Sequence, residues 1–480
     1  MGKRRKSKKK REPGNSPTTP SVPKLLPAAD RGEAPRSVEP EHAPSSPTHW
    51  IMRLIWKSRW RGLILAAITV VTLGLAAYPA LNWLRGLLPH MHPFPTNPVV
   101  ISIQPKGEFG DLRADGLTRG LSTTASLGVL RITANIADMK ARRLDGLLDE
   151  LRKLLAEHNA VAVVGPSISE CTVDVLDCVQ SSGVRVPVII ESSSPRESLA
   201  WNARPFPLFR LSSGIEERAV EVAQIARKLV DFGGTVAFLI ERVANAESYG
   251  ELLYKHTRSH LDPSTLEHVQ IHYFDTSHAG EIVGQPQIAE LFASDAVVFL
   301  FGLGNDFHAV MDAFLQTESK PAHARLVGVM CAYKTTPSLL QGRYRRSQII
   351  ELTDVSPMSQ GLTGRAREIW QNAYRSGPFD PTLRDQAFSF DAGICLAAAM
   401  QDVLRRRSSE PGMTYEDVVA HVASWLMSTT VDGASGKIAF RGEGNSRGQN
   451  AGSALQLVRM DAQGHWTSIS IEQILEPPRP

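Results

Sequence analysis

The stretch AVAVVGPSISECTVDVLDCVQSSGVRVPVII, from Ala160 to Ile190, decides the fold class. It begins and ends with short apolar runs, AVAVVG (160–165) and VPVII (186–190), and its middle predicts a helix over about Ser169–Gln180. Strands that are apolar at every position are typical of parallel sheets that helices cover on both faces. The stretch therefore predicts a strand–helix–strand unit of an α/β protein.

The same alternation of apolar strands and amphipathic helices continues on both sides of this unit. The segment ARRLDGLLDELRKLLAEH (141–158) repeats leucine at helical spacing. Further apolar runs that predict strands are VVISI (99–103), TVAFLI (235–240), VQIHYF (269–274), AVVFLF (296–301) and RLVGVM (325–330). Because about 380 residues are too many for one such sheet, two α/β lobes are expected.

A separate hydrophobic run, GLILAAITVVTLGLAAYPALNWL (62–84), has 23 residues and no charged side chain. A bilayer core needs roughly 20 helical residues, so the run predicts one N-terminal transmembrane helix. Arg53, Lys57, Arg59 and Arg61 precede it, which places the N-terminus in the cytoplasm by the positive-inside rule. We expect a single-pass protein of the cell membrane with a large extracytoplasmic C-terminal domain.

Two other interpretations of this run are a buried core helix and a cleaved signal peptide. A signal peptide has a short charged segment before its apolar core, whereas this run follows 61 residues. The flanking Trp56, Trp60, Tyr78 and Trp83 suit the aromatic belts of a membrane-spanning helix. An uncleaved signal anchor is therefore the favoured interpretation.

The formal net charge of +4 combines segments of opposite sign. Residues 1–61 carry +10 and residues 85–480 carry −6. The acidic outer part argues against a nucleic-acid partner. The basic block KRRKSKKKR (Lys3–Arg11) is expected to set the topology and to touch membrane lipid headgroups, with docking of a nucleic acid or protein as the alternative.

Two flanking segments are expected to lack a packed core. The tail, residues 1–61, is predicted to be disordered because it is rich in proline and poor in large apolar residues. Residues 85–98 contain four prolines and predict a stiff stalk. His90 and His92 in this stalk are weighed as metal ligands, but a solvated linker is favoured, and no metal site is expected.

Polar loops follow three of the predicted strands. Ligands of open α/β sheets bind beyond the carboxyl ends of the strands, and serine hydroxyls and helix N-terminal amides suit an anionic or strongly polar ligand group. The alternative is that these serines are helix caps and turn formers. The candidate ligand-binding residues in these loops are Ser167, Ser169, Ser192, Ser193, Ser194, Gly302 and Asn305.

Six segments of the outer domain carry a resemblance to a known family. They are VVGPSISECT, VPVIIESSSP, FRLSSGIEERAVEVA, NAESYG, AFSFDAGICLAAAM (387–400) and DGASGKIAFRGEGN (432–445). The last two are the most specific, through their order and spacing. Over roughly residues 97–475 the chain resembles type I periplasmic binding proteins of the branched-chain amino-acid-binding (leucine-binding) family, which share their fold with receptor ligand-binding domains.

The resemblance implies a two-lobed α/β fold of parallel sheets with flanking helices, which grips a ligand between the lobes and closes about a hinge. It assigns residues 97–212 and 335–430 to the first lobe and residues 213–334 and 431–478 to the second. By the same resemblance, the candidate ligand-binding residues also include Cys171, Thr172, Tyr249 and Met330.

Two departures from the family weigh against an α-amino acid ligand. The first loop carries Glu170 and Cys171 where further hydroxyls are expected, and a carboxylate beside a ligand carboxylate is unfavourable unless it is paired. The loop after RLVGVM reads Met330-Cys331-Ala332 and lacks the acidic residue that holds the ligand's amino group in the family.

The cysteines leave one disulfide open. Cys171 and Cys178 would lie about 10.5 Å apart on one helix, beyond disulfide reach. A bond would require Cys171 to lie in the loop before the helix, and an exported domain permits one. Buried free thiols are expected for Cys331 and Cys395.

Common catalytic motifs such as HExxH and GxxxxGK[ST] are missing from the sequence, so we expect neither an enzyme nor a cofactor. The sequence predicts a membrane-anchored extracytoplasmic solute-binding protein that captures a small polar ligand for an ABC-type importer permease. The alternative is a ligand sensor or assembly factor that uses the same fold without transport and recruits a partner through its tail. An unrecognised hydrolase is the least favoured interpretation.

Overall fold

The computed structural model describes most of the C-terminal part of the chain, within one compact unit, Leu88–Pro480. The described residues are 92–123, 127–191, 199–242, 248–275, 286–302, 310, 313–314, 325–329, 349–354, 362–374, 383–440, 448–450, 455–460 and 466–476. The predicted tail, the transmembrane run and the first part of the stalk lie outside them.

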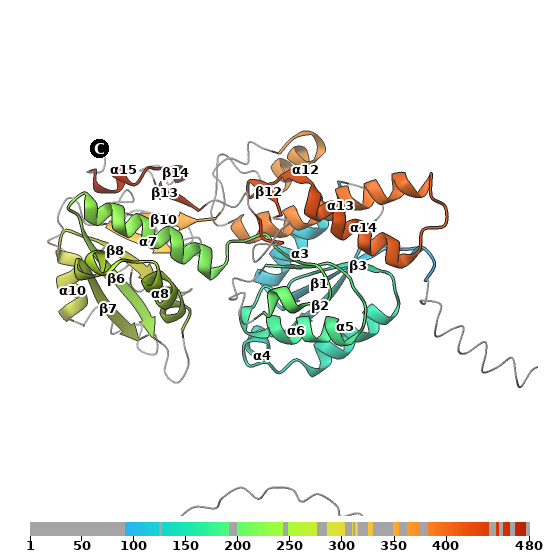
Figure 1. The fold of residues 1–480 in the computed structure, drawn as a ribbon, viewed down its shortest axis with the longest axis horizontal. Coiled ribbons are helices and arrows are strands. Elements are labelled where there is room, and N and C mark those ends of the chain that lie inside the picture. Colours follow the sequence, from blue (N-terminus) through green and yellow to red (C-terminus); the bar gives the residue numbers. More distant parts are fainter. Residues whose placement is uncertain are drawn as a thin grey trace, which may run out of the picture. The chain divides into compact units, whose positions relative to one another are not determined.

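The first lobe is built on a five-stranded parallel sheet (Figure 1). In the order β2-β1-β3-β4-β5, its strands are β2 (Gly128–Ala134), β1 (Val99–Pro105), β3 (Ala160–Val164), β4 (Val188–Ile190) and β5 (Leu208–Arg210). β3 and β4 are buried at every residue, as their continuous apolar sequences predict.

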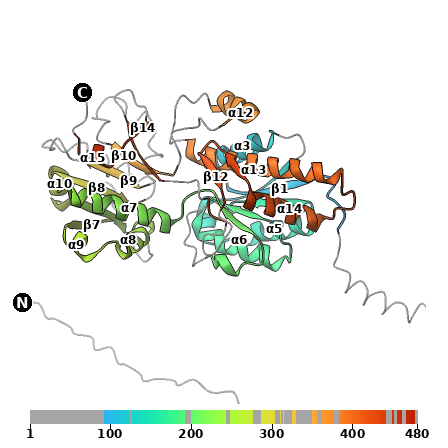
Figure 2. The ribbon, with the colours of Figure 1, turned by 45° about the horizontal axis from the view of Figure 1, so that its top comes forward.

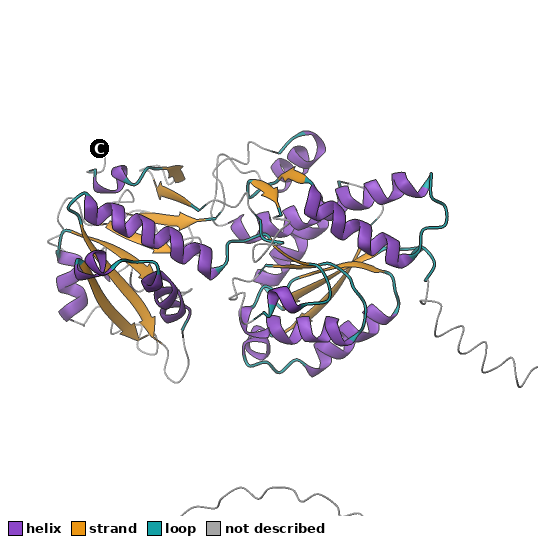
Figure 3. Ribbon diagram, viewed as in Figure 1, coloured by secondary structure: helices purple, strands orange, loops and turns teal. Residues whose placement is uncertain are grey.

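Helices cover both faces of this first sheet (Figure 3). One face carries α3 (Glu108–Leu121), α13 (Arg384–Arg407) and α14 (Tyr415–Ser428), with α12 (Gly364–Tyr374) against α3. The other face carries α4 (Ile136–Lys140), α5 (Asp145–Ala156) and α6 (Ser169–Ser181). The side chains of β1 alternate between the two faces, so that Ile101 and Ile103 pack with the leucines of α5 while Val100 packs with α3 and α13.

The second lobe is built on a seven-stranded sheet of order β14-β13-β10-β9-β8-β6-β7 (Figure 2). The parallel strands are β6 (Thr235–Arg242), β7 (Val269–Asp275), β8 (Ala296–Phe301), β9 (Arg325–Val329) and β10 (Ile349–Thr353), and the antiparallel strands are β13 (Gln456–Met460) and β14 (Trp466–Ser468). Its helices are α7 (Ile215–Asp231), α8 (Tyr249–Ser259), α9 (Pro263–Glu267), α10 (Pro286–Ala293) and α15 (Glu472–Leu475).

This architecture confirms the predicted two-lobed α/β fold, with two differences in where the chain changes lobe. Residues 431–440 were expected in the second lobe, but Ala434 N and Ser435 N donate to Asp391 of α13 in the first lobe. The segment 335–430 was expected in the first lobe, but β10 pairs with β9 in the second sheet. Ile350 and Leu352 of β10 pack in the same core as Val327 of β9, so burial of these apolar side chains keeps residues 349–353 in the second lobe.

The chain passes between the lobes at three places, and hydrogen bonds tie these places together. The first follows β5, the second follows β10, and the third lies between the hairpin of β11 (Thr430–Asp432) and β12 (Lys437–Ala439) and strand β13. The backbone N–H of Asn450, on the third crossover, donates to Arg210 O at 3.0 Å on the first. The backbone N–H of Ser213, on the first, donates to Asp354 Oδ2 at 3.0 Å on the second.

The two most specific sequence motifs meet in the first lobe. The Asp391 carboxylate on α13 accepts hydrogen bonds from Ala434 N at 2.5 Å, from Ser435 N at 2.8 Å and from Ser435 Oγ. Burial raises the pKa of Asp391 to about 7, against the effect of these donors. The aspartate of the first motif thus holds the β11–β12 turn of the second, which is a physical reason for the two motifs to occur together.

Helix α13 is the core helix of the first lobe. Among the described residues it alone is long and apolar enough to cross a membrane, but 78% of its apolar window is buried inside the protein. It crosses α3 at glycines: a Cβ on Gly393 would lie 2.6 Å from Leu117 O, and one on Gly120 would lie 2.2 Å from Phe390 O. Because these contacts involve backbone atoms, neither helix can accept a larger residue there without moving.

We therefore expect Gly393→Ala to destabilise the protein by about 1–3 kcal/mol or more, because the added methyl group overpacks the helix crossing. The matched control is Gly146→Ala on α5, where nothing lies within 4 Å of the added Cβ. Alanine has the higher helix propensity, so the control should be neutral or stabilising by up to about 1 kcal/mol. Chemical denaturation of both variants checks the prediction, and equal stabilities would contradict it.

Candidate functional site

The loop after β3 carries the first group of predicted site residues. Ser167 Oγ is buried and has no hydrogen-bond partner among the described residues, and Ser169 is the first residue of α6. Cys171 and Thr172 are fully buried, and their Sγ and Oγ1 atoms donate to Ile168 O at 3.4 and 2.9 Å. Cys171 and Thr172 thus bond back to the start of their own helix, which favours a structural role for both side chains.

In the second lobe, Tyr249 and Gly302 lie near strand ends. Tyr249 begins α8, after a capping box made by Ser248 and Glu251, and its hydroxyl accepts a hydrogen bond from Arg218 Nη1 at 2.6 Å. Gly302 directly follows β8, and a Cβ there would lie 3.2 Å from Glu241 Oε2. The remaining predicted residues, Ser192, Ser193, Ser194, Asn305 and Met330, lie outside the described residues.

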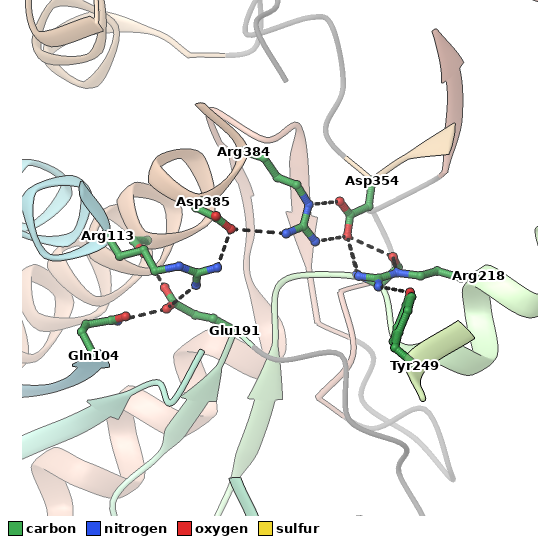
Figure 4. Close-up of polar contacts among 10 residues, drawn as sticks. Gln104, Arg113, Glu191, Arg218, Tyr249, Asp354, Arg384 and Asp385 are labelled. Carbon is green, nitrogen blue, oxygen red and sulfur yellow. Dashed lines mark hydrogen bonds and ion pairs between the residues drawn. The ribbon is translucent and has the colours of Figure 1, made fainter. Parts of the chain in front are cut away.

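A buried network of ion pairs links the strand ends of the first lobe to Tyr249 (Figure 4). It begins at Glu191, the residue after β4, whose side chain has 0% exposure. Glu191 Oε2 accepts hydrogen bonds from Gln104 Nε2 at 3.0 Å and Arg113 Nη1 at 2.8 Å, and Glu191 Oε1 accepts one from Ser389 Oγ. The donors come from β1, α3 and α13, so one carboxylate joins four elements.

The network continues along α13 towards the second crossover. Arg113 Nη2 donates to Asp385 Oδ1, and Arg384 Nη1 lies 3.4 Å from the same oxygen. Arg384 also holds Asp354 in a bidentate pair, with Nε to Oδ1 at 2.8 Å and Nη2 to Oδ2 at 2.9 Å. The planar guanidinium fits a carboxylate in this geometry, which makes such pairs the strongest of the ordinary ion pairs.

Asp354 is the residue on which the second half of the network converges. Its Oδ2 accepts from Ser213 N and Ser213 Oγ, both at 3.0 Å, and lies 3.6 Å from Arg218 Nη2. Burial alone would raise the pKa of Asp354, but Arg384, Arg218 and the Ser213 N–H outweigh burial and hold this pKa below its ordinary value. Asp354 is therefore ionised at neutral pH although its side chain is 0% exposed.

The network balances its charges. Its guanidinium groups, on Arg113, Arg218 and Arg384, face an equal number of carboxylates, on Glu191, Asp354 and Asp385. Removing one member of a buried pair leaves its partner uncompensated, which typically costs about 3–5 kcal/mol. None of these six residues was predicted as a site residue from the sequence, although Glu191 precedes the predicted serines and Arg384-Asp385 precede the AFSFDAG motif.

Three described cysteines are free thiols, so the disulfide considered for Cys171 and Cys178 is not present. Both lie on α6, and each thiol donates to a carbonyl instead, Cys178 to Leu148 O at 3.5 Å. Burial, with the charges of Glu170 and Asp174, raises the pKa of Cys171 to about 12. Cys395 is buried, as predicted, and Cys331 lies outside the described residues.

The end of the predicted stalk is part of the folded domain. His92 stacks on His158 with ring centroids 3.6 Å apart, and His92 O accepts a hydrogen bond from Tyr415 N at 2.8 Å. The expectation of a solvated linker is therefore wrong from His92 onward, because these contacts hold the partly exposed segment against the first lobe. Within the described ranges, the structure contains no cluster of three or more His, Cys, Asp or Glu that could hold a metal ion.

A hollow of about 680 Å³ lies over α3 and β2, away from the network. Its charged residues are already paired, Asp111 with Arg131 at 2.6 Å and Asp115 with Arg119 at 2.7 Å. The hollow is lined by one helix and one edge strand, whereas the network lies where several strands end. We therefore take the network and the strand ends around it as the candidate site.

Solved structures of solute-binding proteins share this fold. An ABC transporter substrate-binding protein from Desulfitobacterium hafniense in complex with Leu is 16% identical, with a TM-score of 0.53 over 77% of this chain and 99% of that one. The leucine binding protein LivK from Thermotoga maritima is 14% identical, with a TM-score of 0.56 over 78% and 98%. A solute binding protein from R. palustris in complex with benzoate is 14% identical, with a TM-score of 0.55 over 77% and 95%.

These neighbours are described as binding proteins rather than enzymes, and at such identities they establish a shared fold. No protein-family model matches the sequence, and no curated protein matches it. The type I periplasmic-binding-protein fold expected from the sequence motifs is thus confirmed at the level of structure, and the ligand has to be argued from the residues of the site.

We expect Asp354→Asn to cost about 3–5 kcal/mol of unfolding free energy at pH 7, because Arg384 and Arg218 lose their buried counter-charge. The pKa of Asp354 is lowered on folding, so its contribution is complete above the unfolded value of about 4 and is lost as pH falls below it. The variant should therefore lose less stability than the wild type between about pH 5 and pH 3.

The matched control for this prediction is Glu150→Gln, on the exposed surface of α5, which should change stability by less than about 0.5 kcal/mol. Denaturant titrations of the three proteins across this pH range give the measurement. An Asp354→Asn protein as stable as the control at pH 7 would show that the network adds little to stability.

Proposed function

We propose that this chain is a membrane-anchored extracytoplasmic solute-binding protein that takes a small polar ligand between its two lobes. The observation that carries the proposal is the network itself, which runs from Glu191 at the end of β4 to Tyr249 at the start of α8. In α/β folds ligands bind beyond the carboxyl ends of parallel strands, and here polar groups from such ends in one lobe are connected to the other lobe. The shared fold with solute-binding proteins supports the same function.

The crossovers support closure of the lobes as the binding motion. Each lobe has a buried core of its own, and a further apolar cluster contains residues of both lobes. The separate cores allow each lobe to move largely as a rigid body. Hydrogen bonds gather the crossovers around Arg210, Ser213, Asp354 and Asn450, and movement of one lobe on the other is confined to these segments. A ligand that contacts both lobes would stabilise the closed arrangement through its differential affinity.

Delivery to an ABC-type permease is the proposed biological role, because the structural neighbours are described as components of ABC transporters. The run 62–84 supplies the proposed anchor to the membrane. A ligand sensor is the second candidate, and one observation favours it: a tail of 61 residues with a charge of +10 precedes the run, far more than an anchor requires. Such a tail offers a docking segment for a cytoplasmic partner.

The binding function predicts that a small polar ligand raises the melting temperature of the full chain purified in detergent. A ligand at 100 times its Kd stabilises the folded state by about 2.7 kcal/mol. The panel consists of amino acids, amides, aromatic compounds and short peptides. Ser167→Ala should weaken the binding of a hit about tenfold, the effect of one lost hydrogen bond of roughly 1.4 kcal/mol.

The control is Ser181→Ala, at the far end of α6, whose hydroxyl donates to Cys178 O at 2.9 Å and should leave binding unchanged. A panel in which every compound leaves the melting temperature unchanged would count against ligand binding, under the importer and the sensor alike.

Deleting residues 1–50 distinguishes the two roles, since the deletion keeps Arg53, Lys57, Arg59 and Arg61, which set the topology. For an importer subunit, we expect uptake of the identified ligand to continue at the wild-type rate. The measurement is radiolabelled uptake, with surface labelling to show equal amounts of protein. For a sensor, we expect the deletion to abolish a ligand-dependent cellular response, and the full chain to contribute nothing to uptake of the ligand.

A further inference from the structure

Glu191 occupies a complete carboxylate-binding position at the carboxyl edge of the first sheet. Its oxygens accept from Gln104 Nε2 at 3.0 Å, from Arg113 Nη1 at 2.8 Å and from Ser389 Oγ. Figure 4 shows the Gln104 and Arg113 side chains converging on this carboxylate from opposite sides. The Glu191 side chain has 0% exposure, so water does not compete with these donors.

A guanidinium, a primary amide and a hydroxyl are the groups with which proteins bind a free carboxylate. Here they come from three separate elements and meet at one point, where the carboxylate belongs to the protein itself. The arrangement is that of an anion-binding site whose anion is the protein's own Glu191 carboxylate.

Among the described residues, the charges in contact with Glu191 leave no place for a second anion beside it. Arg113 is shared between Glu191 and Asp385, and Arg384 is shared between Asp385 and Asp354. A ligand carboxylate beside Glu191 would be a buried charge without a counter-ion, which is strongly unfavourable.

Neutral polar atoms at the same edge, in contrast, have hydrogen-bonding capacity left. Gln104 Oε1, Ser167 Oγ and Ser212 Oγ are buried and have no partner among the described residues. Gln104 lies near the end of β1, Ser167 follows β3 and Ser212 follows β5. All three therefore lie along the same edge of the sheet as Glu191. Amide and hydroxyl groups are the partners that such atoms can bind without a charge penalty.

We propose that Glu191 is a built-in carboxylate that fills the anion site of the first lobe, so that the protein selects an uncharged ligand held through amide or hydroxyl groups and rejects acids. The inference rests on the proposed ligand-binding function and goes beyond it by naming the ligand class. Glu191 then acts as a specificity-determining residue.

Chemical rescue tests the inference without knowledge of the natural ligand. Glu191→Ala should leave a carboxylate-sized hole lined by Gln104, Arg113 and Ser389. We expect sodium acetate or formate to raise the melting temperature of this variant saturably, by a few degrees relative to sodium chloride at equal ionic strength. The wild type, Glu191→Gln, which keeps the hole filled, and the surface control Glu150→Ala should show no such rise.

Should Glu191→Ala fail to remain folded on purification, the same comparison is made on its refolding yield, which acetate should increase and chloride should not. Absence of any acetate effect on this variant would overturn the inference, as would saturable stabilisation of the wild type by acetate or benzoate. Stabilisation of the wild type by benzamide and not by benzoate would support it. A compound that binds the wild type while rescue fails would leave the proposed function standing and reject the role of Glu191.

Discussion

The buried carboxylate of Asp354 connects segments that sheet pairing leaves independent. Asp354 directly follows β10 of the second sheet. Its carboxylate is nevertheless paired with Arg384, at the start of the core helix of the first lobe, and accepts a hydrogen bond from the Ser213 N–H of the first crossover. A buried charge is tolerated only while such partners stay in place. This requirement fixes where two of the three crossovers lie relative to α13, and through Arg384 and Asp385 it fixes where Arg113 and Glu191 lie as well.

The parts of the fold that could be predicted are those in which local pattern and burial agree. The sequence predicts the fully apolar strands β3, β4 and β8 and the amphipathic helix α5, because the pattern of apolar side chains in each element shows which of its faces are buried. Helix α3 and strand β2 were missed. The sequence of α3, EFGDLRADGLTRGL, has three glycines and a weak apolar pattern, and two of these glycines, Gly116 and Gly120, let α13 approach closely. Tertiary packing overrides the local helix propensity there. The sequence of α3 alone does not show which helix packs against it.

The residues of the candidate site also fall into those that could be predicted from the sequence and those that could not. The strand-end rule led to Ser167 and, with the family resemblance, to Tyr249. Tyr249 joins the network through Arg218, and Ser167 Oγ is buried without a hydrogen-bond partner among the described residues. The ion pairs could not be found by spacing, because Arg113 is 78 residues from Glu191 and 272 from Asp385. Cys171 and Thr172 were selected by their position in a loop motif, but α6 begins at Ser169 and turns them into the core. The helix predicted over about Ser169–Gln180 already contained both residues, so the outcome was decided by which face of this helix is buried.

The same fold thus accommodates different ligand chemistry through a few side chains at the strand ends. The solved neighbours were crystallised with leucine and with benzoate, and both ligands carry a carboxylate that requires cationic or hydrogen-bond-donating groups. In this chain the donors at the end of β4 are already engaged by Glu191, and every arginine of the network has a carboxylate partner. Binding energy from charge pairing is therefore internal and present before any ligand arrives. On the proposed function, a ligand would add what the neutral groups, the burial of its apolar surface and the closure of the lobes contribute, so we expect its specificity to lie in shape and hydrogen bonding.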